Sequence, residues 1–199
     1  RVSYYDGSSA MYGNTSDTQF SHIEGYEDHT LNIMGTWDTQ KNLTGLIVNI
    51  ACPSQVDEIL FEISADYWHQ VRKELRRRFG EHICILAQCS AAGDQSPHVL
   101  LCKQAYQRMW ELSGRTERQD IAVRIADGIQ RVLGDIERDI KWQPEFTITS
   151  KKIRLEGYTV SLKEVKQFSK EAEKARNEYE RLKKEIENNP EIMKQSRWY

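Results

Sequence analysis

The feature that most constrains this chain is a strand–helix–strand pattern between residues 43 and 88. The run Leu46–Ala51 is nearly continuously apolar, as expected for a strand buried on both faces. An amphipathic helix is predicted over residues 65–79, followed by a second strand over residues 82–88. The apolar residues at helical spacing are Trp68, Val71, Leu75 and Phe79. Strands joined by a single helix form a right-handed crossover, so we expect these two strands to be parallel.

Capping signals predict where the helices begin and end. Ser64 is the expected N-cap of the helix over residues 65–79, and Gly80 follows its last turn as a C-cap. Two further pairs have the spacing of a capping box, Thr116 with Gln119 and Ser161 with Glu164. These signals predict that two more helices start at Thr116 and Ser161.

The whole pattern predicts an α/β fold. We expect a βαβ-containing parallel or mixed sheet flanked by helices, with a small β-extension and a long charged C-terminal helix. The βαβ core spans residues 30–98, helices occupy residues 99–140, and alternating residues predict strands over 145–160. The long helix covers residues 161–188. We interpret residues 1–199 as a single partial domain.

Composition narrows the classes of function. The net charge is −2, so general binding to nucleic acid is not indicated. The basic run Arg76–Arg78 is interpreted as a solvated last helical turn, with contact to phosphates as the alternative. No apolar run is long enough to span a bilayer, so no transmembrane segment is predicted. The first residue is Arg1 rather than Met, and we expect the chain to be part of a longer protein whose remainder is its partner.

Metal-binding patterns are weak. The four cysteines form no CxxC pair, so neither a zinc finger nor a thioredoxin-like site is indicated. Residues 22–29 hold two histidines and three carboxylates, which are possible metal ligands. Their spacing matches no helical ligand pair, and a solvated charged loop is the stronger interpretation.

The loops after the two predicted parallel strands carry most of the reactive side chains. One loop is Cys52–Gln55, and the other runs from Cys89 to His98. Because open α/β sheets bind ligands at the carboxyl ends of parallel strands, we expect both loops at one such edge. Small residues, including Gly93 with its freedom to adopt positive φ, favour close approach to a ligand. A tight strand-to-helix connection with capping hydroxyls is the alternative.

Ser96 is the candidate nucleophile in the second loop, and it requires activation. His98 stands only two residues away, a separation that rarely brings an imidazole onto a hydroxyl, and no GxSxG motif is present. A metal that polarises a carbonyl is the other route. The residues alone leave both routes open.

The segment Gly93–Pro97, which follows Ala87 and Gln88, resembles the nucleophile segment Gly-Asp-x-Ser-Pro-Asn of the neutral, non-lysosomal ceramidases. The segment Asn49–Ser54 resembles the strand end Ala-x-His-Pro-Thr of that family, where the histidine binds zinc. The order and separation of the two segments are also similar. The resemblance covers residues 30–98 and indicates a fragment of a divergent bacterial member, from the N-terminal catalytic domain.

The resemblance implies a zinc-dependent amidase of sphingolipid metabolism that splits the N-acyl bond of ceramide. Ser96 then matches the catalytic serine, as nucleophile or transition-state contact. Asp94 orients it, and the substrate-binding residues are Gly93, Gln95 and His98. Cys52 stands where the family has a zinc-binding histidine, and His98 stands in place of the usual asparagine. A lipid-like or N-acylated small molecule is the expected substrate. The resemblance also implies a secreted or periplasmic location.

Two alternatives follow from the residues. The exchange of histidine for Cys52 favours a non-catalytic α/β binding or scaffold domain that has lost the zinc site. The helix over 161–188 has an apolar stripe that indicates a short coiled coil or a partner-binding helix, or else packing against its own domain. The stripe consists of Leu162, Val165, Phe168, Ala172, Ala175, Tyr179, Leu182 and Ile186.

Overall fold

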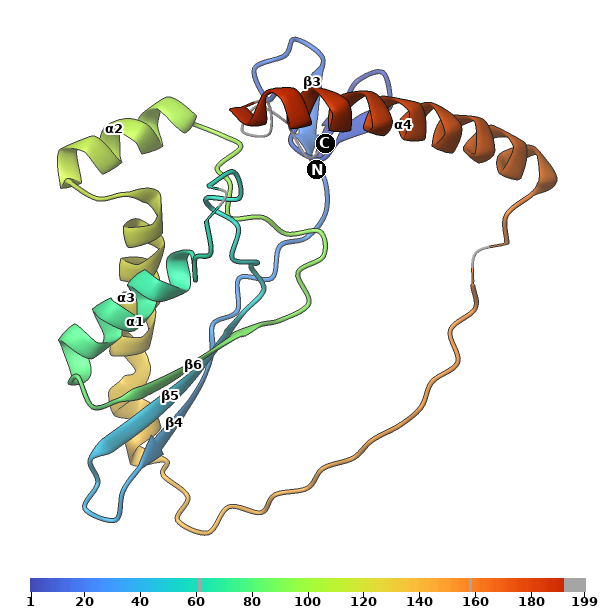
Figure 1. The fold of residues 1–199 in the computed structure, drawn as a ribbon. Coiled ribbons are helices and arrows are strands. Elements are labelled where there is room, and N and C mark those ends of the chain that lie inside the picture. The colour runs from blue at the N-terminus through green and yellow to red at the C-terminus, as the bar shows by residue number, and fades with distance from the viewer. Residues whose placement is uncertain (61, 158, 192–199) are drawn as a thin grey trace. The chain divides into compact units, whose positions relative to one another are not determined.

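The computed structural model describes residues 1–60, 62–157 and 159–191 (Figure 1). The chain, interpreted from its sequence as one partial domain, divides into two compact units, Arg1–Trp142 and Gln143–Tyr199. The two sequence segments with reactive side chains both lie in the first unit. Among the described residues, no helix has the length and apolar character needed to cross a membrane.

The first unit is built on a mixed three-stranded sheet in the order β4-β5-β6. Its strands are β4 (Asn32–Trp37), β5 (Leu43–Ile50) and β6 (Cys84–Cys89). β4 pairs antiparallel with β5, and β5 pairs parallel with β6, with Leu46 opposite Ile85 and Ile50 opposite Cys89. The predicted α/β fold and its parallel crossover are confirmed.

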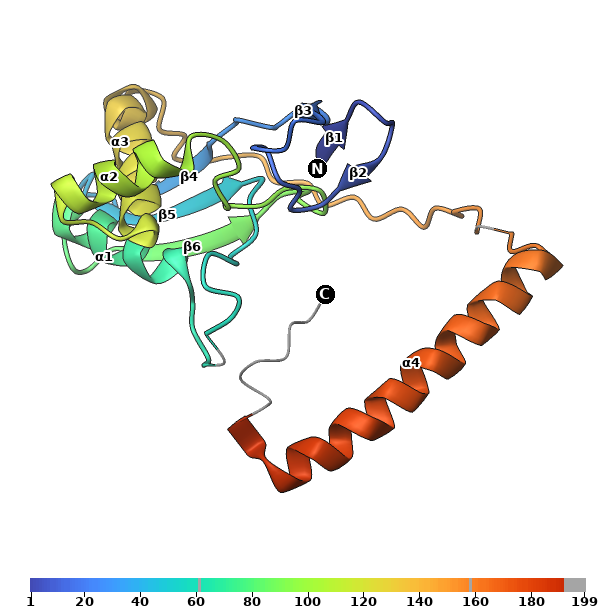
Figure 2. The same ribbon diagram turned by 90° about the horizontal axis from the view of Figure 1, so that it is seen from above.

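Three helices complete this unit: α1 (Tyr67–Phe79), α2 (Lys103–Ser113) and α3 (Glu117–Arg138). α1 and α3 lie side by side on one face of the sheet (Figures 1 and 2). Their apolar stripes enclose the core with the sheet, and the fully buried side chains include Leu46, Val48, Val71, Leu75 and Ile129. Burial of this apolar area is the main stabilising contribution to the unit.

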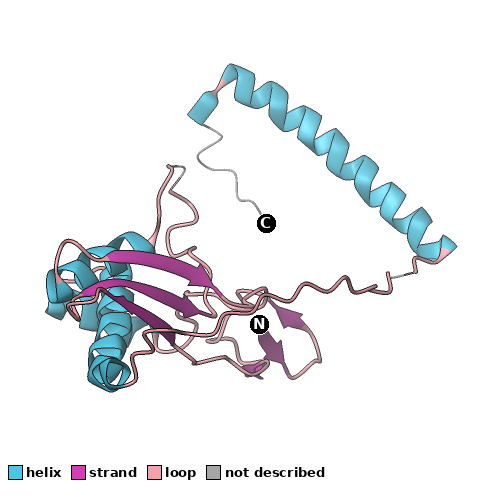
Figure 3. Ribbon diagram, turned by 90° about the horizontal axis from the view of Figure 1, so that it is seen from below, coloured by secondary structure: helices cyan, strands magenta, loops and turns pink. Residues whose placement is uncertain are grey.

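Within the first unit, helices cover the sheet on one face only, and Figure 3 shows its strands from below. Within this unit, the strand at 46–51 is therefore buried on one face, not on both faces as predicted. Leu46 and Val48 point into the core at 2% and 0% exposure, whereas Met34 and Leu86, on the opposite face, are 55% and 49% exposed. Both of these pair across the sheet with Ile47, so the uncovered face has an apolar centre.

Helix α1 starts two residues later than predicted. Its N-cap is Asp66, whose carboxylate accepts a hydrogen bond from the Tyr67 amide at 2.7 Å. Ser64 lies two residues before this N-cap, and its hydroxyl accepts a hydrogen bond from the Asp66 amide at 2.9 Å. Asp66 has φ of 50°, in the left-handed region that is uncommon for residues other than glycine. The capping boxes at Thr116 and Ser161 are both present as predicted.

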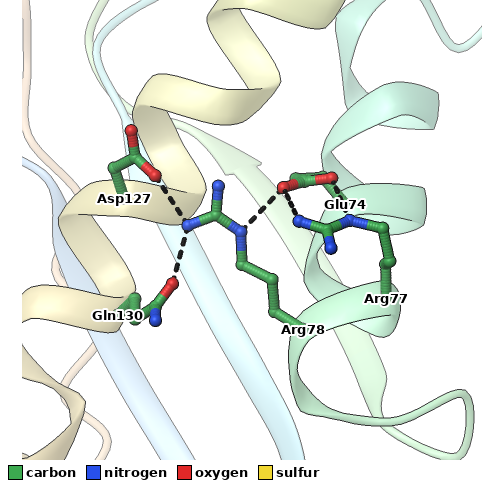
Figure 4. Close-up of polar contacts among 5 residues, drawn as sticks. All are labelled: Glu74, Arg77, Arg78, Asp127 and Gln130. Carbon is green, nitrogen blue, oxygen red and sulfur yellow. Dashed lines mark hydrogen bonds and ion pairs between the residues drawn. The ribbon is translucent and has the colours of Figure 1, made fainter.

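Arg78 joins α1 to α3 (Figure 4). Its guanidinium contacts Glu74 at 2.7 Å on its own helix, and Asp127 and Gln130 at 2.7 and 2.8 Å on α3. Arg77 binds Glu74, and Arg76 donates to the Ile83 carbonyl. Each member of the basic run thus has a partner inside the protein, which argues against the phosphate-binding alternative.

The remaining elements lie before β4 and after α3 in the sequence. Residues 1–30 contain a small antiparallel sheet of β1 (Val2–Tyr4), β2 (Ser9–Ala10) and β3 (Phe20–Ile23). The strands predicted over 145–160 were wrong, since the described residues there form none, and Tyr158 lies outside the described residues. The second unit contains α4 (Leu162–Asn188), a single helix of 27 residues.

Candidate functional site

The carboxyl ends of β5 and β6 meet at one edge of the sheet, as predicted. The described segments that follow are called loop A, residues 51–60 and 62–66, and loop B, residues 90–102. The Ser90 amide donates to the Ile50 carbonyl at 2.9 Å, which continues the strand pairing by one step. The Cys89 thiol lies 3.5 Å from the Cys52 carbonyl oxygen. Loops A and B therefore start side by side.

Loop B places Ser96 in a half-buried position. Its hydroxyl oxygen accepts a hydrogen bond from the His98 amide at 3.2 Å, so the chain turns tightly around this oxygen. The Asp94 carboxylate accepts instead from the Gln95 side chain at 3.2 Å, and no hydrogen bond joins it to Ser96 among the described residues. Gly93 has space around it and does not use positive φ.

The His98 ring is directed to loop A. Its Nε2 lies 3.2 Å from the Glu58 carboxylate, and the His98 side chain is 27% exposed. The Tyr12 ring contacts the imidazole edge-on, with 5.4 Å between the ring centroids. A carboxylate in this position fixes the orientation of the imidazole ring. His98 is thus held by Glu58, and its backbone rather than its ring contacts Ser96.

Loop A is fixed by α1 through the Cys52 carbonyl. The fully buried Tyr67 donates its hydroxyl to that carbonyl at 2.7 Å. The Cys52 thiol is half-buried, and this burial raises its pKa. Since the thiolate is the form that binds metals, a metal ion at Cys52 would have to displace this proton.

The remaining zinc ligands are not found around Cys52. Among residues 1–60, 62–157 and 159–191, no three His, Cys, Asp or Glu side chains are grouped so that they could hold a metal ion. The histidines and carboxylates of residues 22–29 likewise form no group that could hold a metal ion. The described residues therefore contain no complete zinc site, and the zinc that the ceramidase resemblance implies stays a prediction.

Two segments that the sequence analysis did not single out complete the site. The Tyr12 hydroxyl accepts from the Gln55 side chain at 2.8 Å, and the Thr15 hydroxyl donates to the Leu100 carbonyl at 2.6 Å. The N-terminal segment therefore contacts both loops. No local motif marks these residues, because their contacts span 43 and 85 positions of sequence.

The start of α3 is the second such segment. Arg118 forms an ion pair with Asp57 of loop A at 2.8 Å. Glu117 beside it is half-buried, and burial raises the pKa of its carboxyl group, with further contributions from Asp57 and Asp66. His98 acts in the opposite sense and lowers this pKa. The site thus combines one imidazole, several carboxylates and a hydroxyl at one sheet edge.

The raised pKa of Glu117 predicts a pH-dependent effect of Glu117→Gln. The folded protein holds this proton to a higher pH than the unfolded chain, so the wild type loses stability as the pH rises through the folded pKa. The variant has no such loss. We expect the melting temperature of the variant, relative to wild type, to increase from about pH 4 to pH 7.

Thermal unfolding followed by circular dichroism measures this difference. Glu137→Gln, at an exposed carboxylate of the same helix, controls for the removal of one negative charge. A melting difference for Glu117→Gln that falls as the pH rises would show that the folded site stabilises the ionised form instead.

Comparison of the chain with known protein families, curated proteins and solved structures found no match. The family resemblance therefore rests on the two quoted segments and their placement.

Proposed function

We propose that this chain belongs to the catalytic domain of a ceramidase-like hydrolase that cleaves the N-acyl amide bond of a lipid-like substrate. One observation supports this most: Ser96, within the Gly93–Pro97 segment, lies in loop B, and loop B begins beside the Cys52 segment at the carboxyl edge of parallel strands. These are the two segments that resemble the family. Open α/β sheets commonly place their ligand sites at such an edge.

The proposed chemistry begins with attack of the Ser96 hydroxyl oxygen on the amide carbonyl carbon. The hydroxyl proton passes to the nitrogen of the leaving amine, and the acyl group is then bound to Ser96 as an ester. Water hydrolyses this ester, which releases the fatty acid and restores the hydroxyl. The His98 amide, which already donates to the Ser96 oxygen, helps to fix the direction of attack.

The neighbouring residues are proposed to bind the substrate. The exposed backbone at Gly93 gives an amide substrate room to approach, because nothing lies within 4 Å of the position its Cβ would take. Gln95 offers an amide side chain, and the Glu58–His98 pair offers further hydrogen-bonding groups. Asp94 becomes an orienting partner of Ser96 only after its carboxylate leaves Gln95, so its role requires a change in the loop on binding.

Release of free amine from an N-acyl sphingosine tests this function. Purified protein is incubated with the lipid in detergent, and sphingosine and fatty acid are quantified by mass spectrometry. We expect equal amounts of both products, increasing with time. Binding of the lipid without release of either product would contradict the proposal.

A non-catalytic binding or scaffold domain is the second candidate. The cysteine at position 52, where the family has a zinc-binding histidine, favours this candidate. This candidate predicts lipid binding without turnover, also in the presence of added zinc. Metal analysis of the purified protein adds an independent measure, because stoichiometric zinc that is lost in Cys52→Ala would support the enzyme.

A further inference from the structure

Helix α4 exposes a long apolar stripe. The helix has 27 residues and no buried side chain. Val165, Phe168 and Tyr179 are 47%, 48% and 60% exposed. Isolated helices in water are marginal, and most helical stability in proteins comes from packing of an apolar face. The stripe therefore requires a partner surface.

From Val165 to Ile186 the stripe follows a heptad pattern, in which positions a and d form the contact seam of a coiled coil. Leu162, the first residue of the stripe, falls at position e. Position a holds Val165, Ala172, Tyr179 and Ile186, and position d holds Phe168, Ala175 and Leu182. The spacing alternates between three and four residues from Val165 to Ile186 without interruption. Figure 2 shows that α4 is one continuous helix over this length.

The charges beside the seam have opposite signs on its two sides. Position g is glutamate in every heptad, at Glu164, Glu171, Glu178 and Glu185. Position e holds Ser169, Arg176 and Lys183. In a parallel pair of helices, each g residue faces the e residue five positions further along the partner helix. In an antiparallel pair, g faces g, so glutamate would face glutamate.

We propose that α4 forms a parallel, in-register coiled coil with α4 of a second copy of this chain. Glu171 then pairs with Arg176 of the other copy, and Glu178 with Lys183, and two-fold symmetry gives four such pairs. Charges at e and g set partner choice and orientation in coiled coils, which selects this arrangement over the antiparallel one. The small residues Ala172 and Ala175 reduce the buried area at the centre, so the dimer is weak and reversible.

Three of the position g glutamates already form ion pairs or hydrogen bonds within the helix, and variants at position g affect these contacts as well. Arg181, at outward position c, binds Glu178 at 2.5 Å and also binds Glu185. Gln167 donates to Glu171 at 2.9 Å. Charge reversal at position g removes these contacts too, so helix content must be measured for every variant by far-ultraviolet circular dichroism.

Sedimentation equilibrium of the whole chain tests the proposal with two complementary variants. The double variant Glu171→Lys with Glu178→Lys places like charges across the seam, and so does Arg176→Glu with Lys183→Glu. We expect the dimer dissociation constant of each to rise by about tenfold or more. An equimolar mixture of the two restores opposite charges, and is expected to form a heterodimer. Glu173→Lys with Glu180→Lys, at outward position b, is the matched control and should dimerise like wild type.

Three results would overturn the proposal. A wild-type chain that stays monomeric over a wide concentration range would show that the stripe packs on its own chain or takes another partner. A dimer unaffected by either double variant would lie elsewhere on the molecule. Two helical variants that dimerise no more strongly when mixed than alone would exclude parallel pairing of g with e.

Discussion

Ser96→Ala is expected to abolish hydrolysis of an N-acyl sphingosine, with a loss in kcat of at least about a thousandfold. The variant lacks the oxygen that is proposed to attack the amide carbonyl, and no other hydroxyl of the Gly93–Pro97 segment can replace it. Rates of sphingosine release, measured with saturating lipid, report the change. Binding of the lipid should remain, because the contacts proposed for Gly93, Gln95 and His98 are unchanged.

The same substitution also lowers the stability of the fold slightly, and this effect must be separated from the loss of catalysis. The Ser96 oxygen accepts from the His98 amide, and loss of a hydrogen bond of this kind costs about 1 kcal/mol. Assays are therefore run well below the melting temperature of the variant. Ser90→Ala, at another serine of loop B, is the matched control and should retain turnover. Equal rates for Ser96→Ala and wild type would remove Ser96 from the mechanism.

Arg78→Leu is expected to destabilise the first unit by about 2–3 kcal/mol. The Arg78 side chain is 12% exposed, and it bridges Glu74 on α1 to Asp127 and Gln130 on α3 (Figure 4). Its removal leaves the Glu74 carboxylate, which is 16% exposed, with Arg77 as its partner. It also removes the polar contacts between α1 and α3. Urea unfolding measures the change as a lower midpoint with an unchanged slope.

Arg77→Leu provides the control, because Arg77 binds the same carboxylate but is 67% exposed. Water screens an exposed ion pair, so only a slight change in midpoint is expected. Equal destabilisation by the two variants would show that the bridge to α3 contributes nothing.

The bridge also predicts a dependence on pH. Hydrogen bonds from Arg77, then from Arg78, lower the pKa of Glu74 to about 2. A carboxylate with a lowered folded pKa contributes stability above its ordinary pKa, and this contribution is lost as the pH falls from about 4.5 toward 2. Arg78→Leu should therefore differ most from wild type near neutral pH and least near pH 2.

Local signals predicted much of the fold. The parallel strands and the helix between them follow from apolar periodicity, and the capping boxes at Thr116 and Ser161 depend on contacts three residues apart. The strands expected at 145–160 show the limit of such signals. Alternation favours a strand only where a neighbouring strand supplies hydrogen bonds, and Phe146 and Ile148 of that segment are 83% and 79% exposed.

The site was predictable only in part. That loops A and B share an edge follows from the parallel crossover, whereas the partners of His98 do not. Glu58 lies 40 positions and Tyr12 lies 86 positions earlier in the chain, so only the folded structure brings them to the imidazole. The direction of the Asp94 carboxylate toward Gln95 is likewise set by the local turn of loop B rather than by the motif.

Capture of an acyl group on Ser96 would show directly whether this residue is the nucleophile. Protein is mixed with an activated long-chain ester, quenched in acid after a short reaction, digested, and analysed by mass spectrometry. We expect the peptide containing Ser96 to gain the mass of one acyl group, and the Ser96→Ala protein to gain none. Turnover of the ester by wild-type protein without acylation of Ser96, or acylation of another residue that persists in Ser96→Ala, would contradict this expectation.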